Sequence, residues 1–253
     1  MKLNYKSMGQ GPALIILHGL FGSLDNWVSH ARFFSTEFTV YIIDQRNHGK
    51  SPHDDVWNYG VMADDLRDFM DDHGIYQAHL VGHSMGGKVV MQFAADYPER
   101  IMKLVVADMA PKSYSPHHTA ILEALKGLDL AQISNRKAAD TQLTHAIPTF
   151  MTRQFLLKSL KRADQNTFTW KFNLPVIYRD YKKILEKVEV DPPFEGPTLF
   201  LYGGKSTYLT AEDPEWIRAL FPQAVFECLE EAGHWLHAEA PDAFQKALTR
   251  FLL

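Results

Sequence analysis

The sequence is short of cysteine and of long apolar runs. Cys228 is the only cysteine among the 253 residues, so the chain has no internal disulfide and we expect a reducing compartment, the cytoplasm. We interpret Cys228 as a buried strand residue, because it lies in the apolar stretch 224–229. No stretch approaches the roughly 18 to 20 apolar residues of a membrane span. The first residues also lack the basic segment, apolar core and cleavage site of a leader peptide.

The sequence also has little excess charge of either sign. The 26 basic and 30 acidic residues leave a net charge of -4 without a long basic run, which argues against a nucleic-acid partner. His18, His48, His83 and His237 lack a ligand pattern with carboxylates or thiols, so we predict no metal and no other cofactor. We interpret these histidines as walls or supports of a pocket. The composition, 46% hydrophobic and 22% charged, is that of a globular chain with a sizeable core.

The most informative stretch is Gly82-His83-Ser84-Met85-Gly86. It follows residues 78–81, which are interpreted as a buried strand, and precedes a helical pattern of apolar residues that ends before Pro98. A serine between a strand and a helix, with glycine two residues before and after it, is typical of a nucleophile elbow. We therefore predict that Ser84 is a nucleophile, and the alternative is an ordinary glycine-rich turn with an idle serine.

A second glycine-rich loop, 18–22, follows the uniformly apolar run 13–17. In an acyl-transfer enzyme such a loop supplies one backbone N–H of an oxyanion hole, and the residue after the nucleophile supplies the other. These donors are assigned to Leu20 and Met85. A tight strand-to-helix connection is the alternative for the loop taken alone. After a further strand, Asp44 and Arg46 are interpreted as an internal ion pair that braces a polar loop.

Strands and helices alternate along much of the chain, which predicts an α/β fold with a mostly parallel sheet and helices on both faces. The alternation stops at residue 111 and resumes at 194. Between these points, helical patterns at 121–128, 155–160 and 176–188 come without a convincing strand pair. We therefore predict a core formed by residues 1–110 and 194–253, with residues 111–193 inserted as a helical cap over the site. An independent helical domain is the alternative.

With the elbow, the glycine loop and the late Gly233-His234 in this order, the sequence resembles the α/β-hydrolase superfamily. The motifs 18–23, 44–51, 82–88 and 233–239 are similar to those of the bacterial YbfF-type esterases. The resemblance covers almost the whole chain. It implies an α/β-hydrolase fold and a carboxylesterase that works through a Ser-His-Asp triad and an acyl-enzyme, with acyl-CoA thioesterase activity as a further expectation.

The acid of this triad departs from the pattern of many relatives. Their acid follows the strand that here ends at Tyr202-Gly203, where this chain has Ser206. The resembled subgroup takes its acid from the end of the preceding strand, and Asp108 stands there. Asp108 is therefore expected to orient His234, the general base for Ser84. The alternatives are a structural role for Asp108, with Glu212 or Asp213 as the acid.

The substrate is expected to be a small acyl ester or thioester. Phe21, Met109 and Trp235, with Leu20 and Met85, predict an apolar acyl pocket. A thioesterase for nucleotide-bearing thiols needs basic residues at the cap mouth, and the candidates are Arg153, Lys158, Lys161 and Arg179. The rival functions are hydrolysis of carbon-carbon bonds, cofactor-free haloperoxidation, and ligand binding with slow turnover.

Overall fold

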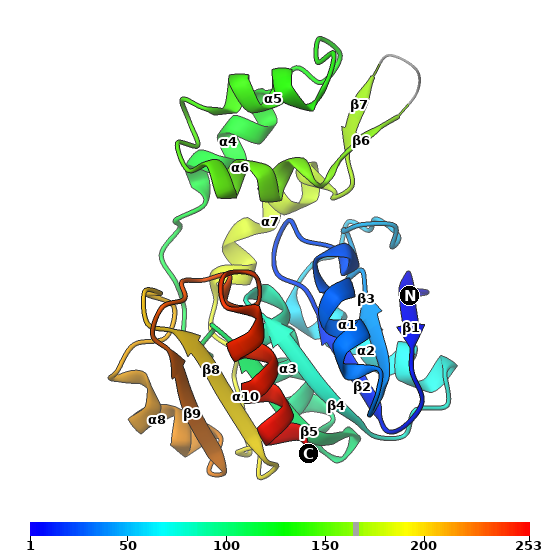
Figure 1. Cartoon of the computed structure of the whole chain (residues 1–253), viewed down its shortest axis with the longest axis vertical. Helices are drawn as coiled ribbons and strands as arrows, with labels where there is room; N and C mark the ends of the chain where they lie inside the picture. Colours follow the sequence, from blue (N-terminus) through cyan, green and yellow to red (C-terminus); the bar gives the residue numbers. More distant parts are fainter. Residues whose placement is uncertain (164–166) are drawn as a thin grey trace.

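The computed structural model describes residues 1–163 and 167–253 and contains a seven-stranded sheet (Figure 1). The strand order is β1-β3-β2-β4-β5-β8-β9, and only β1 runs antiparallel to its neighbour. The strands are β1 (Tyr5–Met8), β2 (Ala13–Leu17), β3 (Thr39–Ile43), β4 (Ala78–His83), β5 (Ile101–Ala107), β8 (Thr198–Gly203) and β9 (Ala224–Leu229). The predicted mostly parallel sheet is confirmed.

Helices cover both faces of this sheet, which explains why its central strands are mostly apolar. In β4, Leu80 packs with helices α2 (Tyr59–Asp72) and α3 (Met85–Asp96), whereas Val81 belongs to the cluster on the opposite face. That opposite cluster includes α1 (Val28–Phe34) and α10 (Pro241–Leu252) (Figure 1). The elements that complete the core are η1 (Leu24–Trp27), η2 (Pro98–Arg100), α8 (Asp213–Leu220) and α9 (Leu236–Glu239).

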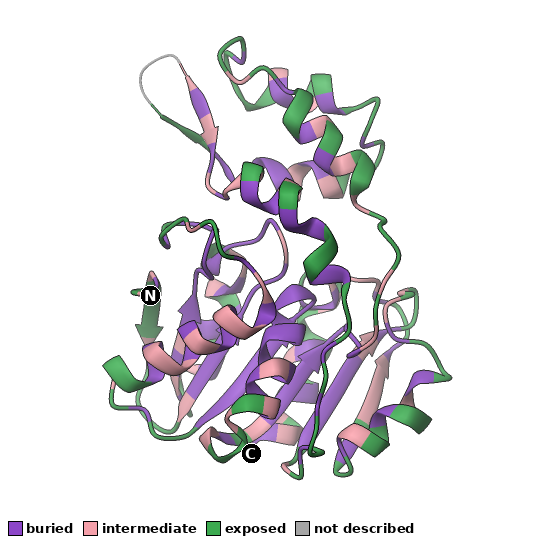
Figure 2. Ribbon diagram, turned by 180° about the vertical axis from the view of Figure 1, so that it is seen from behind, coloured by how far each residue is buried: buried purple, intermediate pink, exposed green. Residues whose placement is uncertain are grey.

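The segment between β5 and β8 stands above the carboxyl edge of the sheet (Figure 1). Its elements are α4 (Thr119–Gly127), α5 (Arg136–Leu143), α6 (Phe150–Leu157), β6 (Leu160–Arg162), β7 (Phe168–Trp170) and α7 (Leu174–Leu185). Its buried residues are continuous with the α2–α3 cluster of the core, and its outer surface is exposed (Figure 2). We refer to this segment as the insertion.

Two expectations about the insertion were wrong. Strands β6 and β7 pair antiparallel, although no strand pair was expected, and Leu160 belongs to β6 rather than to a helix. Each strand has three residues, which is too short for apolar alternation to stand out. Helix α5 was also missed, because it buries only Ala139 and Leu143 and its other residues are polar or small.

The last strand, β9, differs from expectation in its burial. Cys228 is half-buried instead of fully buried, because β9 lies at the edge of the sheet. Among the described residues, no helix has the length and apolar character that a membrane crossing requires. The elements that matter for the site are the carboxyl ends of β2, β4, β5 and β8, which meet beneath the insertion.

Candidate active site

Ser84 stands at the turn between β4 and α3 in a strained conformation. Its φ of 54° and ψ of -118° lie in a region that residues with a side chain rarely adopt. The turn is so tight that a Cβ at position 82 would lie 2.1 Å from the Gly86 carbonyl oxygen, and one at 86 would lie 2.6 Å from the Leu17 carbonyl oxygen. Steric exclusion therefore explains both glycines, and the turn places the buried serine at the carboxyl edge of the sheet.

His234 and Asp108 extend a hydrogen-bonded chain from this serine. The Nε2 atom of His234 lies 3.0 Å from Ser84 Oγ, and Nδ1 lies 2.7 Å from Asp108 Oδ2. A carboxylate only accepts hydrogen bonds, so Nδ1 carries the imidazole proton and Nε2 presents its lone pair to the serine hydroxyl. The three side chains come from the ends of β4 and β5 and from the loop after β9.

Asp108 is completely buried and its carboxylate has two further donors. The Gly203 N–H donates to Oδ1 at 3.1 Å, and the Ser206 hydroxyl donates to Oδ2 at 2.5 Å. The backbone N–H of Asp108 also bonds the Leu201 carbonyl at 2.8 Å, which holds the residue at a positive φ of 51°. Ser206 stands where many relatives are expected to have their acid, and here it donates a hydrogen bond to Asp108.

The two alternative acids lie elsewhere. Asp213 is buried and accepts hydrogen bonds from Lys112 Nζ at 2.6 Å and from the Thr210 N–H at 2.7 Å. Glu212 is exposed at the start of α8. Neither carboxylate contacts His234 among the contacts of the described residues.

The glycine-rich loop after β2 is held by two neutral histidines. His18 Nε2 accepts from the Gln45 N–H at 3.1 Å, so its Nδ1 carries the proton and donates to the Gly19 carbonyl at 2.8 Å. His48 Nε2 accepts from the Phe21 N–H at 3.3 Å, and its Nδ1 donates to the Arg46 carbonyl. Burial lowers the pKa of His18 to about 4 and that of His48 to about 3. Both rings therefore support the loop in their neutral form.

The two predicted oxyanion donors flank Ser84. Leu20 belongs to the glycine loop, and Met85 is the first residue of α3. The first N–H groups of a helix have no partner within the helix and favour negative charge. Both residues line cavities that also contain Ser84 in their walls.

The other two histidines support the His234 loop from below. His83 Nε2 donates to the His234 carbonyl at 2.8 Å, and burial lowers the pKa of His83 well below its usual value. The His237 ring stacks on Trp27, with ring centroids 4.4 Å apart. Among the described residues, no group of three histidine, cysteine or carboxylate side chains is placed to hold a metal ion.

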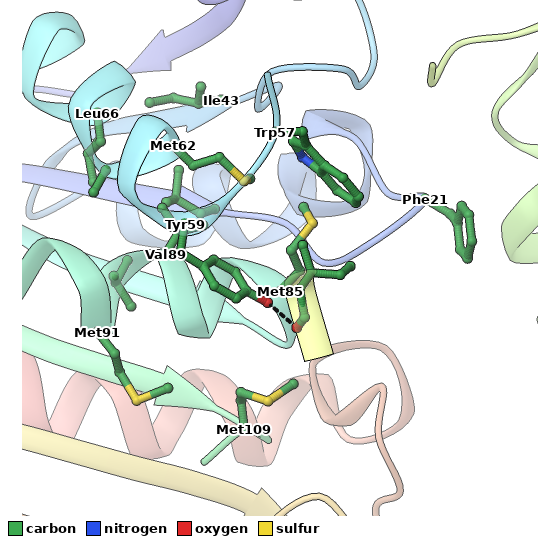
Figure 3. Close-up of a cluster of buried hydrophobic side chains, with 14 of the residues drawn as sticks. Phe21, Ile43, Trp57, Tyr59, Met62, Leu66, Met85, Val89, Met91 and Met109 are labelled. Carbon is green, nitrogen blue, oxygen red and sulfur yellow. Dashed lines mark hydrogen bonds between the residues drawn. The ribbon is translucent and has the colours of Figure 1, made fainter. Parts of the chain in front are cut away.

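The predicted single acyl pocket is divided into two small cavities on either side of Ser84. The histidine-side cavity measures about 40 Å³ and has His234, Phe21, Trp235 and Phe155 in its wall. The methionine-side cavity measures about 30 Å³ and is lined by Met85, Met109, Tyr59, Tyr181 and Leu185, among others. In the close-up, Phe21 points away from Met85, Tyr59 and Met109 (Figure 3). Leu20 and His118 belong to both walls and separate the cavities.

The predicted ion pair between Asp44 and Arg46 does not form. Asp44 accepts hydrogen bonds from Asn4 Nδ2 at 2.7 Å and from the Leu24 N–H at 2.8 Å. Arg46 instead pairs with Asp65 on α2, with Nε 2.6 Å from Oδ2. The two side chains therefore tie the loop to different elements.

Of the four basic candidates at the insertion, two form ion pairs and two do not take part in the ion pairs of the described residues. Arg153 is buried against Asp140 at 2.7 Å, and Arg179 pairs with Asp180 at 2.6 Å, so both have structural partners. Lys161 is exposed on β6. Lys158 lines a third hollow of about 580 Å³, together with Lys137 and Phe150.

Three residues near the site were not predicted from the sequence. Tyr208 stacks on the His234 ring with centroids 3.9 Å apart and an interplanar angle of 15°. His118 forms part of the partition between the cavities, and its Nδ1 lies 3.0 Å from the Tyr181 hydroxyl. Ser159 donates to the Phe21 carbonyl at 2.9 Å. None of them belongs to a local motif, so the sequence carries no signal for them.

Comparisons with known proteins show the family of the chain. Residues 12–241 match the family model described as the alpha/beta hydrolase fold. The chain is 38% identical to esterase YbfF of Escherichia coli, covering 100% of this chain and 99% of that protein. It is also 39% identical to a mouse sn-1-specific diacylglycerol lipase, covering 95% of this chain and 81% of the relative.

Among solved structures, a marine microorganism esterase superposes with a TM-score of 0.96 at 41% identity, with 99% of each chain covered. More distant structures share the fold alone, such as a Bacillus megaterium epoxide hydrolase with a TM-score of 0.70 at 19% identity. The chain therefore belongs to the α/β-hydrolase fold family and, within it, to the YbfF-type esterases.

Proposed function

We propose that the protein is a serine carboxylesterase that cleaves small acyl esters through an acyl-enzyme. The observation that carries the proposal is the hydrogen-bonded chain from Ser84 through His234 to Asp108, with the serine at a strained strand-to-helix turn. An isolated serine hydroxyl is a weak nucleophile at neutral pH and needs an adjacent base. The Nε2 lone pair of His234 is that base.

In the first half of the reaction, Ser84 Oγ attacks the acyl carbonyl and His234 takes its proton. Asp108 keeps the proton of His234 on Nδ1 and stabilises the imidazolium that forms. The N–H groups of Leu20 and Met85 bind the oxyanion, and a single donor of this kind contributes roughly 3 to 4 kcal/mol. His234 then protonates the leaving oxygen, and a water molecule activated by the same ring hydrolyses the acyl-enzyme.

Because His234 must protonate the leaving group, the position of His234 indicates which cavity binds the alcohol and which binds the acyl chain. The leaving alcohol must lie on the side of His234, so the histidine-side cavity accepts it. The acyl chain then enters the methionine-side cavity, whose wall includes Met85 and Met109. Volumes of about 40 and 30 Å³ leave room for only a few water molecules each, since one water needs roughly 10 to 15 Å³. Long acyl chains therefore require the walls to move.

We further propose that residues 111–193 act as a cap that delimits both cavities. Residues of the insertion supply a large share of each wall, including Ile121, Phe155 and Leu156 on one side and Tyr181 and Leu185 on the other.

The reducing environment suited to a chain with one cysteine supports a cytoplasmic location.

Thioesters are proposed as second substrates, because the same triad attacks both acyl classes. The hollow beside Lys137 and Lys158 supports this extension, since those side chains can bind the anionic phosphates of a nucleotide-bearing leaving thiol. It also contains Asp25 and Asp140, so its charge is mixed. Oxygen esters are therefore the primary proposal.

The test is hydrolysis of p-nitrophenyl esters from acetate to palmitate, with acyl-CoA in parallel. Wild type is expected to turn over short esters, and Ser84→Ala is expected to lose at least 10³-fold in kcat. Ser35→Ala, at a half-buried serine at the end of α1, is the matched control and should retain full activity. Equal activity of wild type and Ser84→Ala contradicts the proposal.

Two further assays separate the rival functions. Cleavage of a β-diketone in preference to an ester would indicate carbon-carbon hydrolysis, and halide-dependent oxidation would indicate a haloperoxidase. Labelling of Ser84 by a phosphonate without any ester turnover would indicate ligand binding with slow turnover.

A further inference from the structure

One buried hydrogen bond joins the insertion to the glycine-rich loop of the core. Ser159 lies between α6 and β6, and its Oγ donates to the Phe21 carbonyl at 2.9 Å. Both residues are 3% exposed, so water does not compete for the bond. Because a carbonyl oxygen only accepts, the serine must supply the proton.

This bond is the start of a chain of peptide groups that ends at the predicted oxyanion donor. The Phe21 carbonyl and the Gly22 N–H belong to the same peptide group, and that N–H donates to the Gly19 carbonyl at 3.0 Å. The Gly19 carbonyl in turn shares a peptide group with the Leu20 N–H. In a trans peptide the C=O and N–H point in opposite directions. The Gly19 carbonyl also accepts from His18 Nδ1 at 2.8 Å, and these two donors together fix the direction of the Leu20 N–H.

Hydrogen bonds in such a series polarise one another. A carbonyl that accepts a hydrogen bond makes the N–H of its own peptide group a better donor, an effect of roughly 10 to 30% per bond. The series here runs from the Ser159 hydroxyl through two peptide groups to the Leu20 N–H. Its last member is the group that would meet the oxyanion.

The loop needs such support, because Phe21 adopts a positive φ of 63°. This conformation is strained for a residue with a side chain and persists only where the surroundings hold it. The core holds the Phe21 N–H through His48, and the insertion holds the Phe21 carbonyl through Ser159.

Ser159 is itself held in place by the insertion. Its N–H donates to the Leu156 carbonyl at 3.0 Å, and its carbonyl accepts from the Lys171 N–H at 2.7 Å. The adjacent Phe172 ring packs on the Phe21 ring, with centroids 5.2 Å apart. The position of the serine is therefore set by the insertion, so its hydrogen bond to Phe21 depends on where the insertion lies.

We propose that Ser159 is a positioning residue through which the seated insertion completes the oxyanion hole. The proposal rests on the esterase function proposed above and adds to it a coupling between cap closure and transition-state stabilisation. A substrate that holds the insertion in place thereby also strengthens the Leu20 donor. With the insertion displaced, the Phe21 carbonyl loses its partner and the hole is weakened.

The test compares Ser159→Ala, Ser159→Cys and Ser159→Thr with wild type, using a short p-nitrophenyl ester. Loss of the hydroxyl should lower kcat about tenfold, less than the 10²- to 10³-fold of removing a direct donor, and should leave KM within about twofold. The affinity for a trifluoromethyl ketone, whose adduct carries an oxyanion, should fall in parallel with kcat. Threonine keeps the hydroxyl and should restore kcat, whereas cysteine, a similar-sized but weaker donor, should fall between serine and alanine.

Ser134→Ala is the matched control, because Ser134 is an exposed serine of the same insertion. Thermal unfolding of each variant identifies the temperature at which all are folded, and kinetics are measured there. Unchanged kcat and ketone affinity in Ser159→Ala overturn the inference, as does a rise in KM alone. If wild type equals Ser84→Ala, the proposed function fails and this inference fails with it. If wild type exceeds Ser84→Ala while Ser159→Ala matches wild type, only the inference fails.

Discussion

The role of Asp108 leads to a specific prediction for the variant Asp108→Asn. Oδ1 of this carboxylate accepts from the Gly203 N–H, and Oδ2 accepts from Ser206 and from His234 Nδ1. An amide has one oxygen and one NH₂ group, so it can accept hydrogen bonds either from Gly203 or from Ser206 and His234, but not from both sides. With the NH₂ group toward Gly203, two donors face each other in a fully buried place. With the oxygen toward Gly203, the NH₂ group donates to His234 Nδ1.

The second orientation satisfies the backbone and is therefore favoured. It places the imidazole proton on Nε2, where the ring can no longer accept the proton of Ser84. We expect kcat to fall by about 10⁴-fold, the loss that follows from the wrong tautomer, which corresponds to about 5 kcal/mol in the activation barrier. The measurement is steady-state hydrolysis of p-nitrophenyl butyrate, with thermal unfolding as the check on folding.

A second variant tests the position of the acid. Because Ser206 Oγ lies 2.5 Å from Asp108 Oδ2, an aspartate at 206 can bring a carboxylate close to His234. The double variant Asp108→Asn/Ser206→Asp should recover at least tenfold over Asp108→Asn. Asp213→Asn is the control and should keep kcat within about threefold, because Asp213 bonds Lys112 and Thr210 instead. Asp108→Asn within tenfold of wild type, or a larger loss in Asp213→Asn, would refute the reasoning.

Three other predictions concern the acyl cavity, the elbow and a buried lysine. Met109→Trp fills the methionine-side cavity, so kcat/KM for an octanoate ester should fall at least tenfold more than for acetate; an equal fall would contradict the acyl assignment. Gly82→Ala should prevent soluble expression because its Cβ meets the Gly86 carbonyl at 2.1 Å, whereas Gly127→Ala, with no atom within 4 Å, should be neutral or stabilising in a thermal melt. Burial lowers the pKa of Lys88 from 10.5 to about 7. Between these two pH values the unfolded chain therefore binds more protons than the folded chain. The free energy of unfolding should rise with pH across this window, by at most about 1.4 kcal/mol per pH unit. Lys88→Met should lack this rise in urea titrations at several pH values, and a rise as large as that of wild type would exclude Lys88 as its source.

The predicted fold was confirmed because the sheet has a strong local signature. Its central strands are covered on both faces, so runs such as 13–17 and 104–107 are apolar throughout and alternate with helical patterns. The weaker elements were missed for the opposite reason. Strands β6 and β7 have three residues each and gain their stability from pairing with one another, and α5 buries too few residues to show a pattern.

The sequence by itself determined the elbow and the glycine loop. Part of the elbow's geometry depends on a steric contact within a few residues, because the missing Cβ of Gly82 leaves room for the Gly86 carbonyl. Such contacts follow from residue type and spacing. For the same reason the sequence could name Ser84, Leu20 and Met85 as candidates with defined roles.

Only the tertiary structure decided how distant residues meet. It divides the expected acyl pocket into two cavities, separates Asp44 from Arg46, and brings Ser159 to Phe21 across 138 positions of the chain. The two cavities and the contact between Ser159 and Phe21 depend on where the insertion lies on the sheet. That position results from the packing of many apolar side chains at once, which no short motif encodes.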